Sequence, residues 1–229
     1  MKSVNRRKPA LLMLAVLLIC AAMVLVDGIV RPPYFYKSLL KLLLFLLLPL
    51  GSFLLRKDGA EELKALFLPK KKDFLLAVLL GLGVYAAVLG GYFLLQNQID
   101  FSGIRSSLTD GMGVTADNFL WVSLYIAFVN SLVEEFFFRG YAFLLLRKTA
   151  GRKIAYGFSA AMFAFYHVGM LSGWFHIGIY VLSLLGLFAG GCIFDWLNER
   201  CGSLYPSWIV HMFANFAINT VGFLLFGLL

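Results

Sequence analysis

The chain has 229 residues, of which 61% are hydrophobic, and its mean hydropathy is +0.86. Soluble domains contain about 45–50% apolar residues, so this composition excludes an ordinary soluble domain and indicates a membrane protein. The net charge of +8 would suggest a nucleic-acid partner in a soluble chain, but the cytoplasmic loops of membrane proteins collect Lys and Arg. We therefore expect a lipid bilayer, and no nucleic acid, as the partner.

Continuous apolar runs along the chain predict membrane-spanning helices and exclude a strand-rich barrel, in which polar and apolar residues alternate. Seven runs reach the length of about 20 residues that a span needs, and an eighth, re-entrant segment is the alternative. The predicted spans are 10–26, 37–55, 74–96, 119–146, 154–171, 175–194 and 207–228. We expect an all-α, polytopic helix bundle that forms a single membrane domain over residues 1–229, with a motif-bearing core at about 119–218 and a short surface helix within 97–118.

Basic residues are distributed unevenly between the predicted loops. If the N-terminus is cytoplasmic, 15 Lys and Arg residues fall in inside segments and 4 in outside segments, namely Arg31, Lys37, Lys41 and Arg105. This bias predicts a multi-pass protein of the cell membrane with a cytoplasmic N-terminus and cytoplasmic loops at 56–73 and 147–153. An additional span would invert every later loop, so the span count and the orientation support each other.

The fourth predicted span contains three charged residues in the stretch FVNSLVEEFFFRG, namely Glu134, Glu135 and Arg139. Each such charge at a helix centre costs about +2.5 to +3.5 kcal/mol on insertion scales, so these residues need partners inside the protein. Glu135 and Arg139 lie about 40° apart around a helix and can pair, whereas Glu134 and Arg139 lie about 140° apart. We expect Glu135 and Arg139 to form a structural ion pair and Glu134 to remain available for chemistry. An ion-paired staple between helices is the alternative for all three.

Further polar residues lie in two later predicted spans: His167 in the fifth, and His211 and Asn215 in the seventh. His211, Asn215 and Asn219 form a polar stripe on one helix face. Polar residues inside a membrane usually face one another or a wet cavity, and a Glu with two His can activate water. Glu134, His167 and His211 also match the His₂Glu ligand set of zinc hydrolases, although the chain has no H-E-x-x-H motif. The residues alone leave both possibilities open.

Three motifs resemble those of the CAAX prenyl protease and bacteriocin-processing (CPBP, Abi-type) family of intramembrane proteases. They are Glu134-Glu135-x-x-x-Arg139, Phe163-x-x-x-His167 and His211-x-x-x-Asn215, which occur in the family's order and in separate predicted spans. The resemblance implies an all-helical fold with a conical cavity open to membrane and water. It implies that Glu134 and His167 activate a water for peptide hydrolysis, and that His211 and Asn215 stabilise the oxyanion.

The resemblance predicts an intramembrane endopeptidase that acts on a membrane-associated peptide or protein. Family members have been described both as metal-independent enzymes and as metalloproteases; a divalent metal such as zinc would be held by Glu134, His167 and His211. Prenylated CAAX proteins are one substrate class of the family. A catalytically silent immunity or regulatory protein of the same fold is the alternative, and loss of motif residues would favour it, but all three motifs are intact. A transporter is disfavoured because the chain has no internal repeat.

The predicted depths of the site residues differ. At a rise of 1.5 Å per residue, Glu134 and His167 lie about 20 Å from the cytoplasmic ends of their predicted spans, but His211 lies only about 6 Å from its own. The seventh span must therefore begin deeper than the others, for example after a dip at Pro206, or a water-filled cavity must join the two levels.

Overall fold

The computed structural model of the protein describes residues 7–68 and 73–229. Within these residues seven helices are long and apolar enough to cross a bilayer, which confirms the predicted all-α polytopic bundle of seven spans. They are Lys8–Val30, Tyr34–Leu54, Phe74–Leu95, Phe119–Thr149, Arg152–Leu171, Ile177–Cys201 and Tyr205–Leu225. Five of the basic residues used for the orientation, Lys2, Arg6 and the lysines at 70–72, lie outside the described residues.

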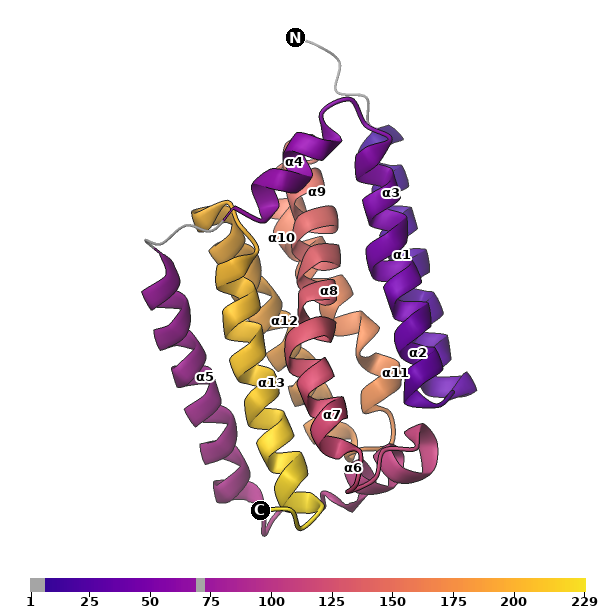
Figure 1. The fold of residues 1–229 in the computed structure, drawn as a ribbon, viewed down its shortest axis with the longest axis vertical. Coiled ribbons are helices and arrows are strands. Elements are labelled where there is room, and N and C mark those ends of the chain that lie inside the picture. The colour runs from indigo at the N-terminus through magenta and orange to yellow at the C-terminus, as the bar shows by residue number, and fades with distance from the viewer. Residues whose placement is uncertain (1–6, 69–72) are drawn as a thin grey trace.

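Several spans combine α-helical and π-helical segments, labelled α and η (Figure 1). In chain order the elements are α1 (Arg7–Leu25), η1 (Val26–Val30), α2 (Tyr34–Lys41), η2 (Leu42–Leu47), α3 (Leu48–Leu54), α4 (Gly59–Leu66), α5 (Phe74–Leu95), α6 (Ser102–Ser106), η4 (Ser107–Gly111), α7 (Phe119–Leu124), η5 (Tyr125–Asn130), α8 (Ser131–Glu135), η6 (Phe136–Phe143), α9 (Leu144–Thr149), α10 (Arg152–Tyr166), α11 (Val168–Leu171), α12 (Ile177–Cys201) and α13 (Tyr205–Leu225). The connection 97–118 holds α6 and η4, as expected. The sixth span ends at Cys201 rather than at residue 194.

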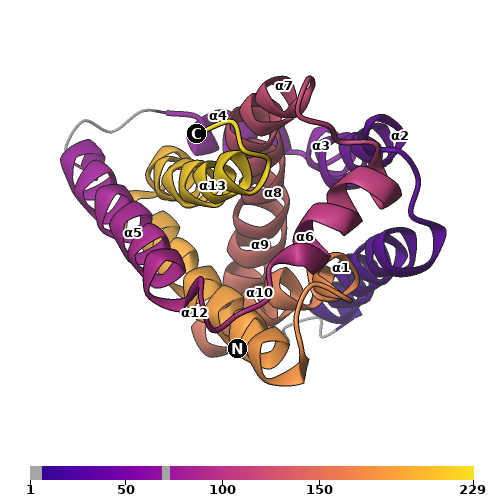
Figure 2. The ribbon, with the colours of Figure 1, turned by 90° about the horizontal axis from the view of Figure 1, so that it is seen from below.

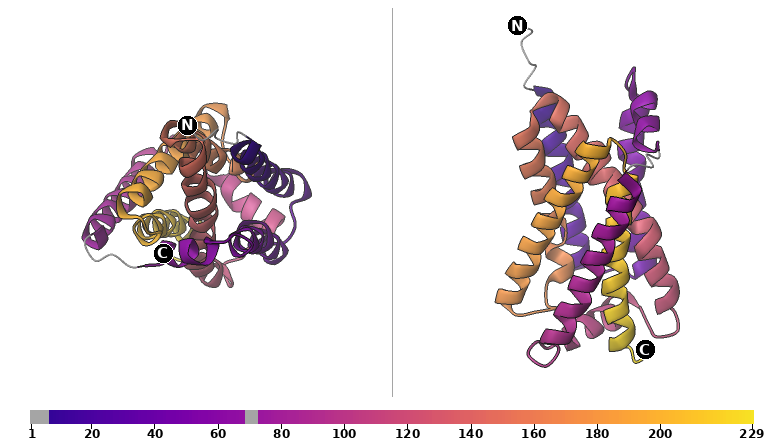
Figure 3. Two further views of the ribbon diagram at one scale, coloured as in Figure 1. Left: turned by 90° about the horizontal axis from the view of Figure 1, so that it is seen from above. Right: turned by 90° about the vertical axis from the view of Figure 1, so that its left-hand side faces the viewer.

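The fourth span, from α7 to α9, runs through the middle of the bundle (Figures 2 and 3). Helices α10, α12 and α13 lie on one side of it, the first two spans lie on the other, and α5 packs on the outside of α13. In its most apolar window 44% of the residues are buried inside the protein, compared with 11% for α5. The charged residues of the fourth span can therefore find partners on every side without facing lipid.

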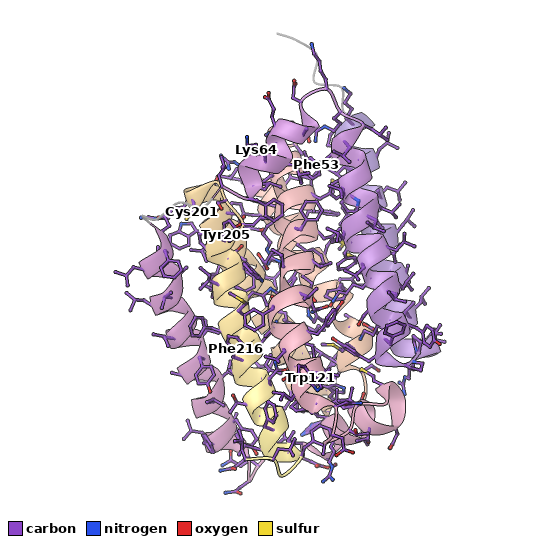
Figure 4. All side chains as sticks on the ribbon, in the orientation of Figure 1. Phe53, Lys64, Trp121, Cys201, Tyr205 and Phe216 are labelled. Atoms are coloured by element: carbon purple, nitrogen blue, oxygen red, sulfur yellow. The ribbon has the colours of Figure 1, made fainter. Side chains whose placement is uncertain are left out.

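The turn between α12 and α13 lies deeper in the bundle than the end of α3, and α4 lies above it (Figure 1). The backbone carbonyl of Leu66, at the end of α4, accepts a hydrogen bond from Leu204 N at 2.9 Å and one from Ser203 Oγ at 3.3 Å. Side chains at this end of the molecule include those of Lys64 and Tyr205 (Figure 4). The seventh span therefore begins deeper than the second span ends, in the direction of the first of the two alternatives for the depth of its histidine, although the third span, α5, begins lower still (Figure 1).

Two basic residues that the charge count placed outside the membrane are instead buried within the second span. Lys37 is 7% exposed and Lys41 is 4% exposed. Lys37 Nζ lies 2.7 Å from Asp27 Oδ1 of the first span, and Lys41 contacts the fourth span. The placement of these two lysines outside was wrong, and Arg31 and Arg105 remain as the outside basic residues. With these two lysines removed from the outside segments, the excess of basic residues in the inside segments becomes larger, and the predicted orientation rests on this excess.

Candidate active site

The two glutamates of the first motif lie on one short α-helical segment between two π-helical segments of the fourth span, and Arg139 lies in the second of these. η5 ends at Asn130 and η6 begins at Phe136, so α8 between them carries both Glu134 and Glu135. π-helical turns inside helices are frequent at functional sites. The two glutamates are 2% and 0% exposed, and they have different neighbours. These neighbours determine what each carboxylate can do.

The two carboxylate oxygens of Glu134 have unequal surroundings. Oε1 accepts hydrogen bonds from Lys41 Nζ at 2.5 Å, Asn130 Nδ2 at 2.7 Å and Tyr166 OH at 2.7 Å. Oε2 is buried and has no hydrogen-bond partner among the described residues. His211 Nε2 lies 3.7 Å from it. The expectation that Glu134 remains available therefore applies to one of its oxygens, whereas the other is held by three donors.

His211 joins the two adjacent glutamates. Its Nδ1 lies 2.9 Å from Glu135 Oε1, at hydrogen-bond distance, while its Nε2 faces Glu134. The imidazole stacks on the ring of Phe194, with the centroids 5.2 Å apart, and meets the edge of Phe163 at 5.9 Å. Donation from Nδ1–H to Glu135 fixes the orientation of the ring, so Nε2 is the nitrogen directed at the open oxygen of Glu134.

Glu135 and Arg139 lie together inside the bundle, in the geometry expected of residues one helical turn apart. Arg139 Nη1 is 3.3 Å from Glu135 Oε1, and both side chains are fully buried. Arg139 Nε lies 3.5 Å from Asp195 Oδ1 of α12, and Asp195 also accepts a hydrogen bond from Ser159 at 3.0 Å. The guanidinium lies 4.3 Å from the centroid of the Phe163 ring. The pair is therefore part of a network that joins the fourth, fifth and sixth spans.

His167 follows directly after α10 and is 8% exposed. Its Nδ1 lies 2.7 Å from the backbone carbonyl of Phe163, so the preceding helical turn orients the ring and leaves Nε2 for other partners. The ring packs against that of Tyr166 at 4.3 Å, and Tyr166 OH binds Glu134. His167 therefore adjoins the Glu134 cluster through Tyr166.

The polar stripe of α13 is directed at the fourth span, but its members have different partners. Asn215 Nδ2 donates to the carbonyl of Ile126 at 3.2 Å, and Asn219 Nδ2 donates to the carbonyl of Ser123 at 3.0 Å. Of the stripe, His211 reaches the carboxylates, while the two asparagines bind backbone carbonyls. The structure thus gives Asn215 a helix–helix hydrogen bond rather than a contact with the other predicted site residues.

Three residues of the site were missed at the sequence level. Lys41 and Tyr166 contact Glu134, and Asp195 contacts Arg139. Lys41 had a usable signal, because an ionisable residue within a span is a functional candidate by default. Tyr166 directly precedes a predicted site histidine, and Asp195 lies one residue beyond the predicted end of the sixth span.

Three of the motif residues that carry the proposed chemistry are buried, whereas Asn215 is half-buried. Glu134, His167 and His211 are 2%, 8% and 6% exposed. A pocket of about 430 Å³ lies between α5, α7 and α13, and its lining includes Tyr85 and Phe216 but none of these three residues. The resemblance implied a conical cavity open to membrane and water; the pocket between α5, α7 and α13 does not reach Glu134, His167 or His211.

The side chains around Glu134 do not fit a divalent metal. In the part of the chain that the structure describes, no group of three or more His, Cys, Asp or Glu side chains is arranged to hold an ion. Glu134 Oε1 is already bonded to the ammonium of Lys41, whose positive charge opposes a second cation nearby. His211 Nε2 and Glu134 Oε2 are 3.7 Å apart, a separation that two ligands at about 2.0–2.2 Å from one ion can have, but no third such ligand is arranged with them in the described residues. The zinc hypothesis, with Glu134, His167 and His211 as ligands, gains no support from this geometry.

Residues 116–217 match the family model described as Type II CAAX prenyl endopeptidase Rce1-like. These residues are Rce1-like. The match confirms the family resemblance suggested by the three motifs, all of which lie inside it. No curated protein and no solved structure gives a match to the chain.

The Rce1-like segment supplies every residue of the three motifs, and at the level of the family it supports a CAAX-protease-like enzyme. The seven apolar helices fit a multi-pass membrane protein, so the general setting is a lipid bilayer. Lys41 and its helix lie outside the Rce1-like segment. The site described here is therefore built from that segment together with the second span.

Proposed function

We propose that this protein is an intramembrane endopeptidase, which hydrolyses a peptide bond of a membrane-associated protein or peptide with a water activated by Glu134. One observation carries the proposal: Glu134 Oε2 is a buried acceptor without a hydrogen-bond partner among the described residues, and it faces His211 Nε2 at 3.7 Å. A carboxylate oxygen in this position can accept a hydrogen bond from a water and then take its proton. The other oxygen is engaged, which fixes the direction of the basic one.

The two histidines have separate roles in this proposal. His167, oriented by the carbonyl of Phe163, positions the attacking water with Nε2. His211, oriented by Glu135, faces the reacting region with its own Nε2. An imidazolium donates from both ring nitrogens, so a protonated His211 can bond Glu135 and the developing oxyanion at the same time. Glu134 then returns the proton to the leaving amine, which completes hydrolysis without net proton loss.

Asn215 is proposed as a second donor to the oxyanion. Its side chain has two N–H bonds, and the hydrogen bond to Ile126 O uses one of them. The other is available to a substrate carbonyl that enters beside His211, one helical turn away. Glu135 and Arg139 act in the structure of the site, because Glu135 orients His211 and Arg139 neutralises Glu135.

A catalytically silent immunity or regulatory protein of the same fold is the second candidate. The observation in its favour is the burial of Glu134, His167 and His211, which are 2%, 8% and 6% exposed and closed to substrate in this structure. An enzyme would have to open before it cleaves, as many enzymes do through helix or loop movements. Intact motifs favour the enzyme, and a cleavage assay separates the two candidates.

The test compares membranes that contain the wild-type protein with membranes that contain a Glu134→Gln variant at equal folded amounts. New peptide termini that depend on wild-type protein would identify the substrate and the cleaved bond. The name of the matched family makes peptides with a prenylated CAAX terminus the first defined substrates to assay, with unprenylated versions as controls. Identical termini in both membranes, with both proteins folded, would favour the silent candidate.

The orientation in the cell membrane is also proposed, with the N-terminus in the cytoplasm. The basic residues around α4 and at the turn from α9 to α10 lie at one end of the bundle, and α6, which contains Arg105, lies toward the other (Figure 1). Single cysteines placed in 56–68 and 97–118, after replacement of the native cysteines, can be labelled in intact cells with an impermeant thiol reagent. We expect labelling in 97–118, and preferential labelling in 56–68 would contradict the orientation.

A further inference from the structure

Lys41 is a buried cation at the centre of the candidate site, and none of the three motifs includes it. It ends α2, it is 4% exposed, and it lies 93 residues before Glu134 in the chain. An ionisable side chain inside a membrane span is costly and persists where it has partners and a use. Because α2 lies outside the Rce1-like segment, the family match says nothing about this residue.

The ammonium group of Lys41 has an acceptor for each of its three N–H bonds. The acceptors are Asn130 Oδ1 at 2.6 Å, Glu134 Oε1 at 2.5 Å and Tyr166 OH at 2.5 Å. Asn130 and Tyr166 in turn donate to the same oxygen of Glu134. These four side chains form a closed network, called here the lysine network. It fixes the Glu134 carboxylate so that Oε2 is the atom left outside the network.

The lysine network also determines which cation belongs in the site. Metal-dependent hydrolases use a divalent ion to hold and polarise the reacting groups. Here the positive charge beside the reactive carboxylate is part of the polypeptide, and a bound divalent ion next to Glu134 would be repelled by it. The charge is also shielded from the surface, because the side chain of Lys41 is 5% exposed and that of Glu134 is 2% exposed.

We propose that Lys41 is the resident cation of the active site, a positioning residue that holds Glu134 Oε1 so that Oε2 faces the reacting water, in place of a bound metal ion. The inference rests on the proposed peptidase function for its catalytic consequence. The pairing and the absence of a metal requirement can be measured without any substrate.

The chain offers a matched control for Lys41. Lys37 lies one turn earlier on the same helix, is 7% exposed, and pairs with Asp27 at 2.7 Å. Lys37→Met therefore also removes a buried ammonium from an ion pair, but at a distance from Glu134. Effects that are specific to Lys41→Met can be attributed to the lysine network rather than to the loss of any buried lysine from α2.

The first test is a double-mutant cycle on the melting temperature of the full-length protein in detergent. We expect Lys41→Met to lower the melting temperature in the wild-type background and to leave it unchanged or raise it in a Glu134→Gln background, where no carboxylate is stranded. Lys37→Met should lower it equally in both. Equal losses for Lys41→Met in both backgrounds would overturn the pairing. If Lys41→Met alone does not fold, recovery of folded protein in the double variant supports the pairing, and failure to recover contradicts it.

The second test measures kcat and KM on a substrate identified by the comparison of peptide termini. Misplacement of a catalytic group by about 1 Å can cost about 10²-fold in rate, so we expect Lys41→Met to lower kcat by that order with little change in KM. Lys41→Arg, which keeps the charge, should recover part of the rate, and Lys37→Met should retain the wild-type kcat.

Lys41→Gln replaces Lys41→Met if the latter does not fold. A wild-type kcat in the folded neutral variant would overturn the positioning role. Full cleavage by Glu134→Gln would end the peptidase proposal but leave the result of the melting cycle intact.

The third test addresses the metal directly, with zinc alone as the probe. The melting temperature of the wild-type protein is measured after treatment with a chelator and again after addition of zinc. We expect the same value in both states, because Lys41 supplies the cation. A rise with zinc that Glu134→Gln abolishes, or a fall with the chelator that zinc reverses, would show a metal at Glu134 and overturn the proposal.

Discussion

Glu134 and Glu135 are neighbours in the sequence and on the same helical turn, but their carboxylates lie in two different kinds of surroundings. Glu135 Oε1 is shared by His211 and Arg139 in a network that continues to α12. Glu134 Oε1 is held by three donors, and its Oε2 has no hydrogen-bond partner among the described residues. Both carboxylates are neutralised by a buried cation, but with different consequences. The partners of Glu135 tie it into the structure of the bundle, whereas the partners of Glu134 gather on one oxygen and leave the other for chemistry.

The two surroundings also come from different parts of the chain. The partners of Glu135 lie within the Rce1-like segment, whereas the cationic partner of Glu134 comes from the second span, outside it. The sequence match, which begins at residue 116, therefore includes both glutamates. It also includes the partners of Glu135, but it does not include the lysine that pairs with Glu134.

The largest expected effect is the loss of cleavage on substitution of Glu134. General base catalysis contributes about 10²–10⁴-fold, so Glu134→Gln should reduce kcat by at least that order, measured on protein that has been shown to fold. Glu135→Gln keeps a hydrogen-bond acceptor for His211 and should retain more activity while losing more stability. If Glu135→Gln folds normally and is inactive while Glu134→Gln cleaves, the assignment of the two glutamates is reversed.

The next effect is on stability and comes from the Glu135 side. Removal of one partner from a buried ion pair costs about 3–5 kcal/mol because it leaves an uncompensated charge. Arg139→Met should lower the free energy of unfolding by about that amount, since it strands both Glu135 and Asp195. The measurement is denaturant unfolding in detergent micelles. A loss of less than about 1 kcal/mol, the size typical of exposed pairs, would show that Arg139 is not the centre of this network.

A matched pair of substitutions on α13 sharpens the comparison further. Asn215→Ala and Asn219→Ala each remove one side-chain hydrogen bond to a carbonyl of the fourth span. Each should therefore cost about 1 kcal/mol in stability. If Asn215 also contributes to the oxyanion site, only Asn215→Ala should lower kcat, and by less than the 10²–10³-fold that is typical of a dominant donor. Equal kcat values for the two variants would assign Asn215 to helix packing alone.

The smallest expected effect is at an exposed arginine that serves as the control for Arg139. Arg152 Nε lies 2.9 Å from Glu199 Oε2, and its side chain is 67% exposed. Exposed ion pairs typically contribute about 0.2–1 kcal/mol, so Arg152→Met should lower the free energy of unfolding by no more than that. If Arg152→Met lowered the free energy of unfolding as much as Arg139→Met does, the loss could not be attributed to the burial of Arg139. It would instead be a general effect of removing an arginine.

Helical periodicity and hydropathy predicted much of this arrangement. The seven spans follow from the lengths of the apolar runs, and the proximity of Glu135 and Arg139 follows from their spacing on one helix. Contacts between spans could not be predicted in the same way. Lys41 and Glu134 are 93 residues apart, and no local pattern specifies that α2 and α8 are neighbours. Asp195 was missed because α12 continues beyond its apolar run to Cys201.

The depth of His211 illustrates the same limit and has a further consequence. The carbonyl of Leu66 receives hydrogen bonds from Leu204 and Ser203, so the end of α4 acts as a stop against which the α12–α13 turn rests. The number of residues between this stop and His211 sets the height at which the imidazole meets the two glutamates. This stop comes from the connection between the second and third spans, whose described residues include none of the motif residues. A change in the length of α4 is therefore expected to move the point against which the α12–α13 turn rests, and with it the start of the helix that carries His211.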